Sequence, residues 1–272
     1  MKVAAIQMVS GIERDVNLAQ ARQALAQAAE QGAELAVLPE YFCLLGQRDT
    51  DKLAIQEPFG QGPMQGMLAQ AARELGLWVV GGTLPLSVSG QPDRVRNSCL
   101  VYNPAGDCVA RYDKMHLFGF DNGQERYDES RVLQAGDTPA WFDLSARDGQ
   151  AWRVGLSVCY DLRFPELYRA HAAAGATVLS VPANFTPATG EAHWELLLRA
   201  RAVENQCFVL AAGQQGIHVT GEGAWGHSMI VDPWGRVLAE VPEGEGFAAA
   251  DLDLGMQAAI RTSLPALAHR RL

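Results

Sequence analysis

The stretch Val154-Gly155-Leu156-Ser157-Val158-Cys159-Tyr160-Asp161-Leu162-Arg163-Phe164-Pro165-Glu166-Leu167 predicts a buried strand that runs directly into a helix. Its first half is a short apolar run, and its second half has Pro165 at a helix start and Glu166 near the positive end of the helix dipole. Cys159 therefore lies at the carboxyl end of a strand, where α/β proteins place ligands and reactive groups. A lone cysteine in an apolar run is more often a small buried side chain, so the rest of the chain must decide between these interpretations.

Two further motifs place reactive side chains at the ends of apolar runs. Leu38-Pro39-Glu40 ends in a carboxylate, and Arg111-Tyr112-Asp113-Lys114-Met115-His116-Leu117-Phe118 has a lysine just past a strand-like run. Taken alone, Glu40 is typical of a capping or surface carboxylate, and Lys114 of a solvated surface residue. Together with Cys159, they place three reactive side chains at three strand ends, which suggests one site.

Length, composition and charge set the class of protein. A chain of 272 residues is long for one domain, but α/β folds often reach this size, and we expect a single domain over residues 1–272. The net charge of −9 argues against nucleic acid or an anionic membrane as the main partner. No apolar run approaches the roughly 18 residues that cross a bilayer. Residues 3–8 are already strand-like and follow no basic region, so no secretory signal is expected.

The cysteines form an odd, widely spread set without a Cys-x-x-Cys pair, which fits free thiols in a reducing cytoplasm. The set is Cys43, Cys99, Cys108, Cys159 and Cys207. The six histidines are scattered and form no helical His-x-x-x-His pair, so no zinc site is expected.

Helix-linked strands alternate with hairpins along the chain, which predicts mixed rather than purely parallel sheets. Asn17 is expected to cap the first helix, and the strand at residues 247–252 is expected to end the regular structure. Residues 119–136 lack periodicity and are long for an idle loop, so we expect them to cover the site. Further helices are expected at residues 64–75, 165–174 and around 193–205, and hairpin turns at 103–106 and 232–235.

The three motifs occur in the same order as those of the nitrilase, or carbon–nitrogen hydrolase, superfamily, and the chain resembles that superfamily over nearly its whole length. The resemblance implies an α/β fold, a four-layer α-β-β-α sandwich with two mixed β-sheets. It also implies a homodimer or larger homo-oligomer built through helices next to the active site.

The resemblance assigns Glu40 the role of general base, Lys114 that of oxyanion-stabilising lysine and Cys159 that of nucleophile. The chemistry is consistent with these roles, because a free thiol at neutral pH is only a few per cent thiolate and needs a base to attack an amide. A fixed ammonium and a backbone N–H, for which we choose Tyr160, would stabilise the tetrahedral intermediate. The scheme needs no metal or organic cofactor.

Two side chains near Lys114 leave alternatives open. The resemblance implies a second glutamate that holds Lys114 and the substrate, and Glu129 matches it, with Glu125 as a nearby competitor. A papain-like Cys–His pair is conceivable, because His116 lies two residues beyond Lys114 and shares its face of an extended strand. The same geometry permits a structural histidine, which we favour.

Substrate binding is predicted around two segments. Arg163 follows the nucleophile in the same turn and could hold a carboxylate through two hydrogen bonds, although an ion pair at the surface is an equal alternative. Phe185 could line the pocket or pack in the core, and its neighbours Asn184 and Thr186 are grouped with it as substrate-binding candidates.

Within the superfamily, the chain looks most like the branch of deaminated glutathione amidases, on residues 159–167, Arg96-Asn97-Ser98 and Trp225-Gly226-His227-Ser228-Met229. These enzymes serve metabolite repair and release α-ketoglutarate and cysteinylglycine. The alternative is an ω-amidase acting on α-ketoglutaramate or α-ketosuccinamate. An aliphatic nitrilase ranks third, since nitrilase chains usually extend further at the C-terminus, and a catalytically silent interaction protein ranks last. We expect a small-molecule amide substrate and a cytoplasmic location.

Overall fold

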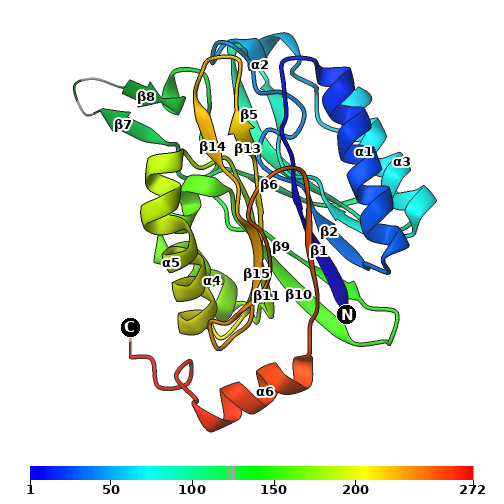
Figure 1. Ribbon diagram of the computed structural model, residues 1–272, viewed down its shortest axis with the longest axis vertical. Helices are drawn as coiled ribbons and strands as arrows, with labels where there is room; N and C mark the ends of the chain where they lie inside the picture. The colour runs from blue at the N-terminus through cyan, green and yellow to red at the C-terminus, as the bar shows by residue number, and fades with distance from the viewer. Residues whose placement is uncertain (122, 124–125, 272) are drawn as a thin grey trace.

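The computed structural model describes residues 1–121, 123 and 126–271. Across these residues a pair of mixed β-sheets stacks face to face, and helices cover both outer faces (Figure 1). This is the four-layer α-β-β-α sandwich that the family resemblance implied. Of the helices in this part of the chain, none is both long and apolar enough to span a membrane.

The first sheet carries parallel strands at its centre and antiparallel strands around them. In order across the sheet, its strands are β17 (Gly246–Asp251), β1 (Lys2–Gln7), β2 (Leu35–Val37), β3 (Trp78–Val80), β5 (Gln91–Tyr102) and β4 (Leu84–Val88), with β6 (Cys108–Asp113) beside β5. β1, β2 and β3 are parallel, and β5 is antiparallel to both β3 and β6. The carboxyl ends of β2, β3 and β6 therefore point the same way.

The second sheet repeats this arrangement. In order, its strands are β16 (Val237–Val241), β15 (Ser228–Val231), β12 (Phe208–Gly213), β11 (Val178–Ala183), β10 (Ala151–Leu156) and β9 (Trp141–Ser145). β10, β11 and β12 are parallel, and β9 and β15 pair with them antiparallel. The central strands of both sheets are almost wholly buried, which explains their near-continuous apolar sequences.

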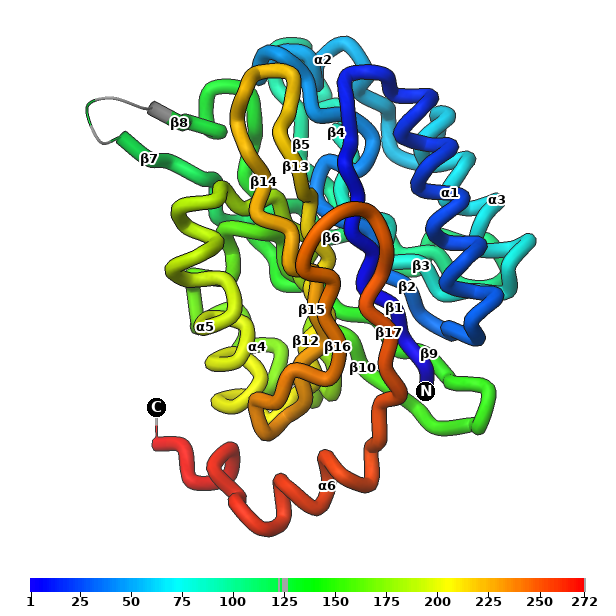
Figure 2. The backbone as a smooth tube through the Cα atoms, viewed as in Figure 1, coloured from blue at the N-terminus to red at the C-terminus, as the bar shows by residue number. Residues whose placement is uncertain are grey.

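Prolines in the sequence mark where three of the described helices begin. α1 (Arg14–Glu30) and α3 (Pro63–Leu75) cover the first sheet, whereas α4 (Pro165–Ala173) and α5 (Pro187–Asn205) cover the second (Figure 2). α3, α4 and α5 each begin with proline, whose fixed φ suits the first helical position and whose missing N–H costs nothing there. A short α2 (Asp51–Ala54) lies between α1 and α3 in the sequence.

The alternation of side chains along β1 assigns its two faces to different cores. Val3 and Ala5 pack in the cluster between the sheets with Val154 of β10, whereas Ala4 and Ile6 pack toward the α1 and α3 side. All of these residues are fully buried. The period of two therefore builds a double-sided sheet, and the inter-sheet core fixes the relative position of the strand ends that carry the polar residues.

Four details differ from the sequence predictions. Asn17 lies inside α1, whose N-cap is Glu13. The side-chain amide of Asn17 forms hydrogen bonds with backbone groups of Gly11 and Cys43 instead, and so ties the helix to two loops. Residues 119–136 contain a hairpin of β7 (Gly119–Asp121) and β8 (Arg126–Asp128), followed by the 3₁₀ turn η1 (Glu129–Arg131). A second hairpin, β13 (Gln215–Ile217) and β14 (Gly223–Trp225), lies beyond the end of β12.

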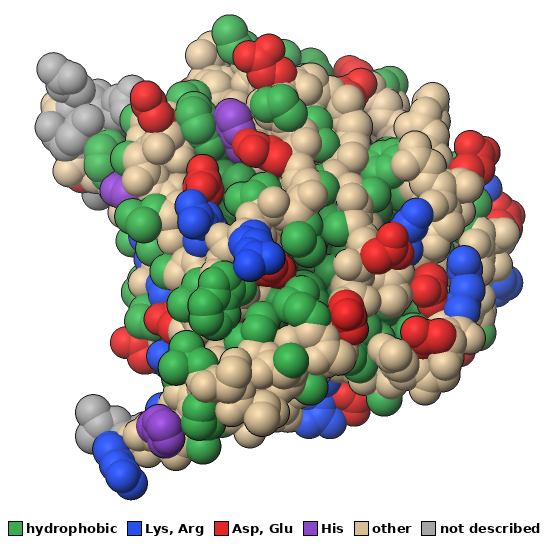
Figure 3. All heavy atoms as spheres, turned by 60° about the horizontal axis from the view of Figure 1, so that its bottom comes forward, with side chains coloured by type: hydrophobic (Ala, Val, Ile, Leu, Met, Phe, Trp, Pro, Cys, Tyr) green, Lys and Arg blue, Asp and Glu red, His purple; other side chains and the backbone are tan. Residues whose placement is uncertain are grey.

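The fourth difference is a helix after β17, α6 (Leu254–Ser263), which lies at the opposite end of the molecule from β7 and β8 (Figure 1). Polar side chains hold it: Gln257 donates to the carbonyls of Thr177 and Gln206, and Arg261 donates to the carbonyl of Ala176. In Figure 3 this end faces the viewer, and the C-terminal tail projects from the body while charged side chains are scattered over the face.

Gly82 allows the chain after β3 to pass against the segment that carries Glu40. Its φ is +53°, and a Cβ there would lie 2.1 Å from the carbonyl oxygen of Pro39. We expect Gly82→Ala to lower the free energy of unfolding by more than about 3 kcal/mol, through the left-handed backbone and the backbone clash. Urea titration measures this.

The matched control is Gly90→Ala, in the turn between β4 and β5. Gly90 also has a positive φ of +74°, but no atom lies within 4 Å of the position that the alanine methyl group would take. This substitution should cost only about 1 kcal/mol. Equal losses for both variants would contradict the steric argument.

Candidate active site

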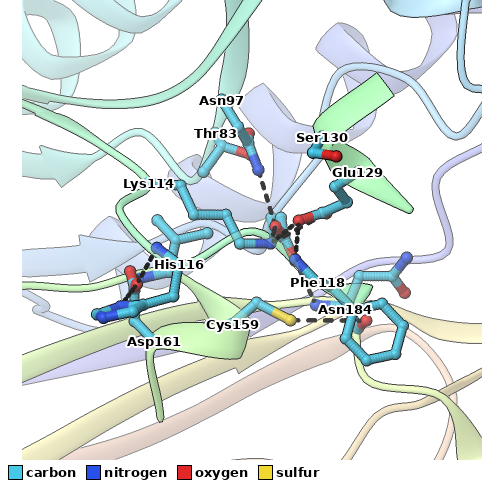
Figure 4. Close-up of polar contacts among 12 residues, drawn as sticks. Thr83, Asn97, Lys114, His116, Phe118, Glu129, Ser130, Cys159, Asp161 and Asn184 are labelled. Carbon is cyan, nitrogen blue, oxygen red and sulfur yellow. Dashed lines mark hydrogen bonds and ion pairs between the residues drawn. The ribbon is translucent and has the colours of Figure 1, made fainter. Parts of the chain in front are cut away.

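The polar residues singled out in the sequence lie at the carboxyl ends of strands from both sheets (Figure 4). Glu40 follows β2 and Lys114 directly follows β6, whereas Cys159 follows β10 and Asn184 follows β11. The backbone N–H of Asn184 donates to Oε2 of Glu40 at 3.0 Å, so the two sheets are joined at this point. The structure thus brings the three reactive side chains to one place.

A buried ion cluster forms the centre of the site. Nζ of Lys114 lies 2.9 Å from Oε1 of Glu40 and 2.8 Å from Oε2 of Glu129. The side chains of Lys114 and Glu40 are each only 1% exposed, so neither charge would be tolerated there without its partner. One ammonium is shared by two carboxylates, which leaves a surplus of negative charge beside the cysteine.

Glu129 is held by more than the lysine. Its carboxylate accepts hydrogen bonds from the hydroxyl of Tyr41 at 2.9 Å and from the backbone N–H of Phe118 at 2.7 Å. The turn η1 that carries it follows directly on β8. Glu129 thus occupies the position beside Lys114 that was predicted for it, whereas the competing candidate, Glu125, lies outside the described residues.

Cys159 lies at a strained corner. It begins the 3₁₀ turn η2 (Cys159–Arg163) with a φ of +49°, a region that costs a non-glycine residue free energy and is typical of functional sites. The side chain is nearly buried, and its Sγ points to the carbonyl oxygen of Asn184 at 3.8 Å. Tyr160, whose backbone N–H was predicted to stabilise an oxyanion, is the next residue of the same turn, and its ring packs against Phe118.

The electrostatics of the site keep the resting sulfur protonated. Burial raises the pKa of the Cys159 thiol well above its usual value, Glu40 raises it further, and Lys114 opposes both. Burial also raises the pKa of Glu40, against the lowering effect of Lys114. For Lys114, burial favours the neutral amine, but Glu129 and Glu40 outweigh it and raise the pKa. A proton acceptor with a raised pKa therefore lies beside a thiol that needs one.

His116 contacts Asp161 rather than the sulfur. Its Nδ1 lies 2.7 Å from Oδ1 of Asp161, and its ring stacks on Phe164 at 3.7 Å between centroids. Asp161 is fully buried and also accepts hydrogen bonds from the hydroxyl of Tyr112 and the backbone N–H of Val158. These contacts support the structural interpretation of His116 and connect the strand of Lys114 to the turn of Cys159.

Arg163 lies at the margin of the site, half-buried among aromatic rings. Its guanidinium is 5.8 Å from the ring centre of Tyr160 and 5.7 Å from that of Phe185, and its Nη1 is 3.3 Å from Nδ1 of His193. Phe185 itself packs on Trp194, and the hydroxyl of Thr186 pairs with that of Thr189 in the first turn of α5. Phe185 therefore serves the core and faces Arg163 at once.

Sequence reasoning gave no role in the site to Tyr41, Asp161 or Asn97. Nδ2 of Asn97 donates to Oε1 of Glu40 at 2.8 Å. Asp161 and Asn97 lie within quoted motifs and Tyr41 directly follows Glu40, but these local patterns do not predict contacts between residues far apart in the sequence. Among the residues that the structure describes, no group of three or more His, Cys, Asp or Glu side chains is arranged to hold a metal ion.

The chain is similar to proteins of known activity. The sequence profile of the family described as carbon-nitrogen hydrolase matches residues 2–262. The deaminated glutathione amidase of Yersinia enterocolitica is 39% identical over 271 residues, which cover 99% of this chain and 92% of that protein. The ω-amidase NIT2-B of Xenopus laevis is 37% identical over 97% of this chain and 92% of its own length.

A solved structure shows the same fold. The NitFhit protein of C. elegans superposes with a TM-score of 0.88 at 36% identity. The superposition covers 99% of this chain but only 65% of NitFhit, which is the longer protein.

Proposed function

The chain belongs to the carbon–nitrogen hydrolase family, and from this premise we propose that it is a cysteine-dependent amidase whose substrate is deaminated glutathione. The observation that carries the proposal is the buried cluster of Glu40, Lys114 and Glu129 beside Cys159 at its strained corner. A thiol, a proton acceptor and a fixed cation are the groups that hydrolysis of an amide through a thioester requires.

In the proposed first step, Sγ of Cys159 attacks the amide carbon while Glu40 takes the thiol proton. The C–S bond forms as the carbonyl π bond opens, and the negative charge moves to the carbonyl oxygen. Lys114 and the backbone N–H of Tyr160 stabilise that oxyanion. The raised pKa of Glu40 supports its role, because a base with a very low pKa would not accept a thiol proton.

Collapse of the intermediate completes acylation. The oxyanion re-forms the carbonyl, the C–N bond breaks, and Glu40 gives its proton to the departing amine. Glu40 then removes a proton from water, which attacks the thioester, and Cys159 leaves as the thiol when Glu40 returns the proton. The products are a carboxylic acid and an amine, and Glu129 keeps Lys114 in place throughout.

Arg163 supports an α-keto acid as the acyl part. Its guanidinium lies on the aromatic rings of Tyr160 and Phe185, where a carboxylate would be shielded from water and could accept two parallel hydrogen bonds. Deaminated glutathione carries this group on the α-ketoglutarate part, and cysteinylglycine is then the leaving amine. Asn184 and Thr186 complete the proposed substrate side.

The second candidate function is that of an ω-amidase, favoured by the similarity to the ω-amidase of Xenopus laevis. α-Ketoglutaramate has the same acyl part as deaminated glutathione, so Arg163 cannot separate the two substrates. Discrimination must come from the side of the leaving group, which is ammonia in one case and a dipeptide in the other.

We also propose that residues 1–272 act as one domain in a cytoplasmic homodimer or larger homo-oligomer. The five cysteines are all free, which suits a reducing compartment. α5, next to the site, exposes Leu196 and Val203 on its outer face at 67% and 48%, which supports an assembly through this helix.

Two variants distinguish the role of Glu40 from that of His116. Glu40→Gln should reduce amide turnover at least a thousandfold, because the amide side chain cannot accept the thiol proton. His116→Ala should lower turnover only about tenfold, because it removes a charge-assisted contact with Asp161 and no reacting group. Steady-state kinetics measures both. Full activity of Glu40→Gln would rule out its assignment as the base.

Arg163→Leu should lower kcat/KM for α-ketoglutaramate roughly a hundredfold, because the substrate carboxylate loses its partner. The matched control is levulinamide, which keeps the keto group and the amide but lacks the carboxylate. Its low kcat/KM should be almost unchanged by Arg163→Leu. An equal loss with both amides would show that Arg163 supports the site without binding the carboxylate.

The substrate itself is tested by comparing kcat/KM for deaminated glutathione and α-ketoglutaramate, with Cys159→Ala as the blank. We expect deaminated glutathione to be preferred at least a hundredfold, about 2.7 kcal/mol of differential transition-state binding. The reverse preference would make the protein an ω-amidase. Turnover of neither would refute the substrate proposal while leaving the chemistry of the site to be tested with other amides.

A further inference from the structure

The carboxylate of Glu40 receives different hydrogen bonds on its two oxygens. Oε1 accepts from Nδ2 of Asn97 at 2.8 Å and from Nζ of Lys114 at 2.9 Å. Oε2 accepts from the backbone N–H of Asn184 at 3.0 Å, and the carbonyl of that same residue accepts from Sγ of Cys159. Oε1 therefore accepts from two side-chain donors, whereas Oε2 accepts from a single backbone N–H.

Asn97 is held in place by the backbone next to the site. It lies on β5, is 2% exposed, and its backbone carbonyl accepts the N–H of Lys114 at 3.0 Å. Its Oδ1 is buried and has no hydrogen-bond partner among the described residues, so the amide group is held by its contact with Glu40 alone. An ionised carboxylate can only accept hydrogen bonds, and the amide meets it with its N–H₂ group.

We propose that Asn97 is a positioning residue for the base, one that occupies Oε1 of Glu40 and so directs the proton taken from Cys159 onto Oε2. Two donors already point at Oε1, and a proton placed there would face both of them. Oε2 accepts from one backbone N–H only and keeps a lone pair for the proton. This inference rests on the proposed function, since it concerns the same proton transfer.

Asn97 donates a hydrogen bond to Glu40 without adding a charge to the buried ion cluster. The groups that face Glu40 are Lys114 from the end of β6, Glu129 from η1, Cys159 from η2 and the hydroxyl of its own neighbour Tyr41. A second cation would lower the pKa of Glu40 too far for a base, and a further carboxylate would raise it. A neutral donor stabilises the ionised form moderately and fixes its orientation.

The test is Asn97→Leu, which keeps the size of the side chain and removes the donor. We expect the acidic limb of the kcat/KM profile to move upward by roughly one pH unit, because the ionised form of Glu40 loses a hydrogen bond. A structural role alone predicts a uniform loss of activity at every pH with the limb unmoved. That result would overturn the proposal.

A second measurement needs no substrate and so separates this proposal from the proposed function. Carboxyl carbons of protein labelled with [δ-¹³C]glutamate are titrated by NMR, and Glu40→Gln identifies the resonance of Glu40. In Asn97→Leu its midpoint should move to higher pH. An unmoved midpoint refutes the role of Asn97, whereas failure of the wild-type protein to cleave keto amides would refute only the substrate.

Ser98→Ala is the matched control on the same strand. Ser98 is buried like Asn97, but its hydroxyl donates to Asp113 at 2.5 Å and not to Glu40, so the limb and the midpoint should stay in place. If Asn97→Leu does not fold, Asn97→Asp takes its place. A carboxylate beside Oε1 should also move both midpoints upward, through like charge, and unmoved midpoints would again overturn the proposal.

Discussion

The ammonium of Lys114, buried between two carboxylates, is the interaction on which the site depends. Each of these charges would cost several kcal/mol to bury alone, and each is tolerated because the others are present. Since two negative charges face one positive charge, the surplus disfavours a thiolate at Cys159 until a substrate brings an electrophile. Burial raises the pKa of the Cys159 thiol and of Glu40, and the cluster adjusts both: Glu40 raises the pKa of the thiol further, whereas Lys114 lowers each of the two.

The sandwich holds the strand ends of its two sheets within hydrogen-bond distance of each other. Glu40 and Lys114 come from the first sheet, Cys159 and Asn184 from the second, and the backbone of Asn184 spans the gap to both Glu40 and the sulfur. The inter-sheet core, built from the alternating faces of strands such as β1 and β10, fixes that gap. A substitution that changes the packing of this core would therefore change the distances between site residues of the two sheets.

How far the sequence predicts this arrangement depends on the range of the interaction. Pro165 at a helix start and apolar runs that end in polar residues are local signals, and they placed α4 and the strand ends before Glu40, Lys114 and Cys159 correctly. Asn97 reaches a partner 57 residues away and Tyr41 one 88 residues away, and no local pattern encodes such pairs. α6 was not predicted, and the contacts that hold it, from Gln257 and Arg261 to carbonyls just before β11 and β12, join residues far apart in the sequence.

The protonation state of Cys159 also affects how readily its sulfur is oxidised. Peroxides attack thiolates, and the readiness of a cysteine to form a sulfenic acid follows its thiolate character and its exposure. Burial and the neighbouring carboxylate reduce the first, and an exposure of 8% reduces the second. Burial beside Glu40 therefore favours the thiol form of Cys159, which reacts more slowly with peroxide than the thiolate does.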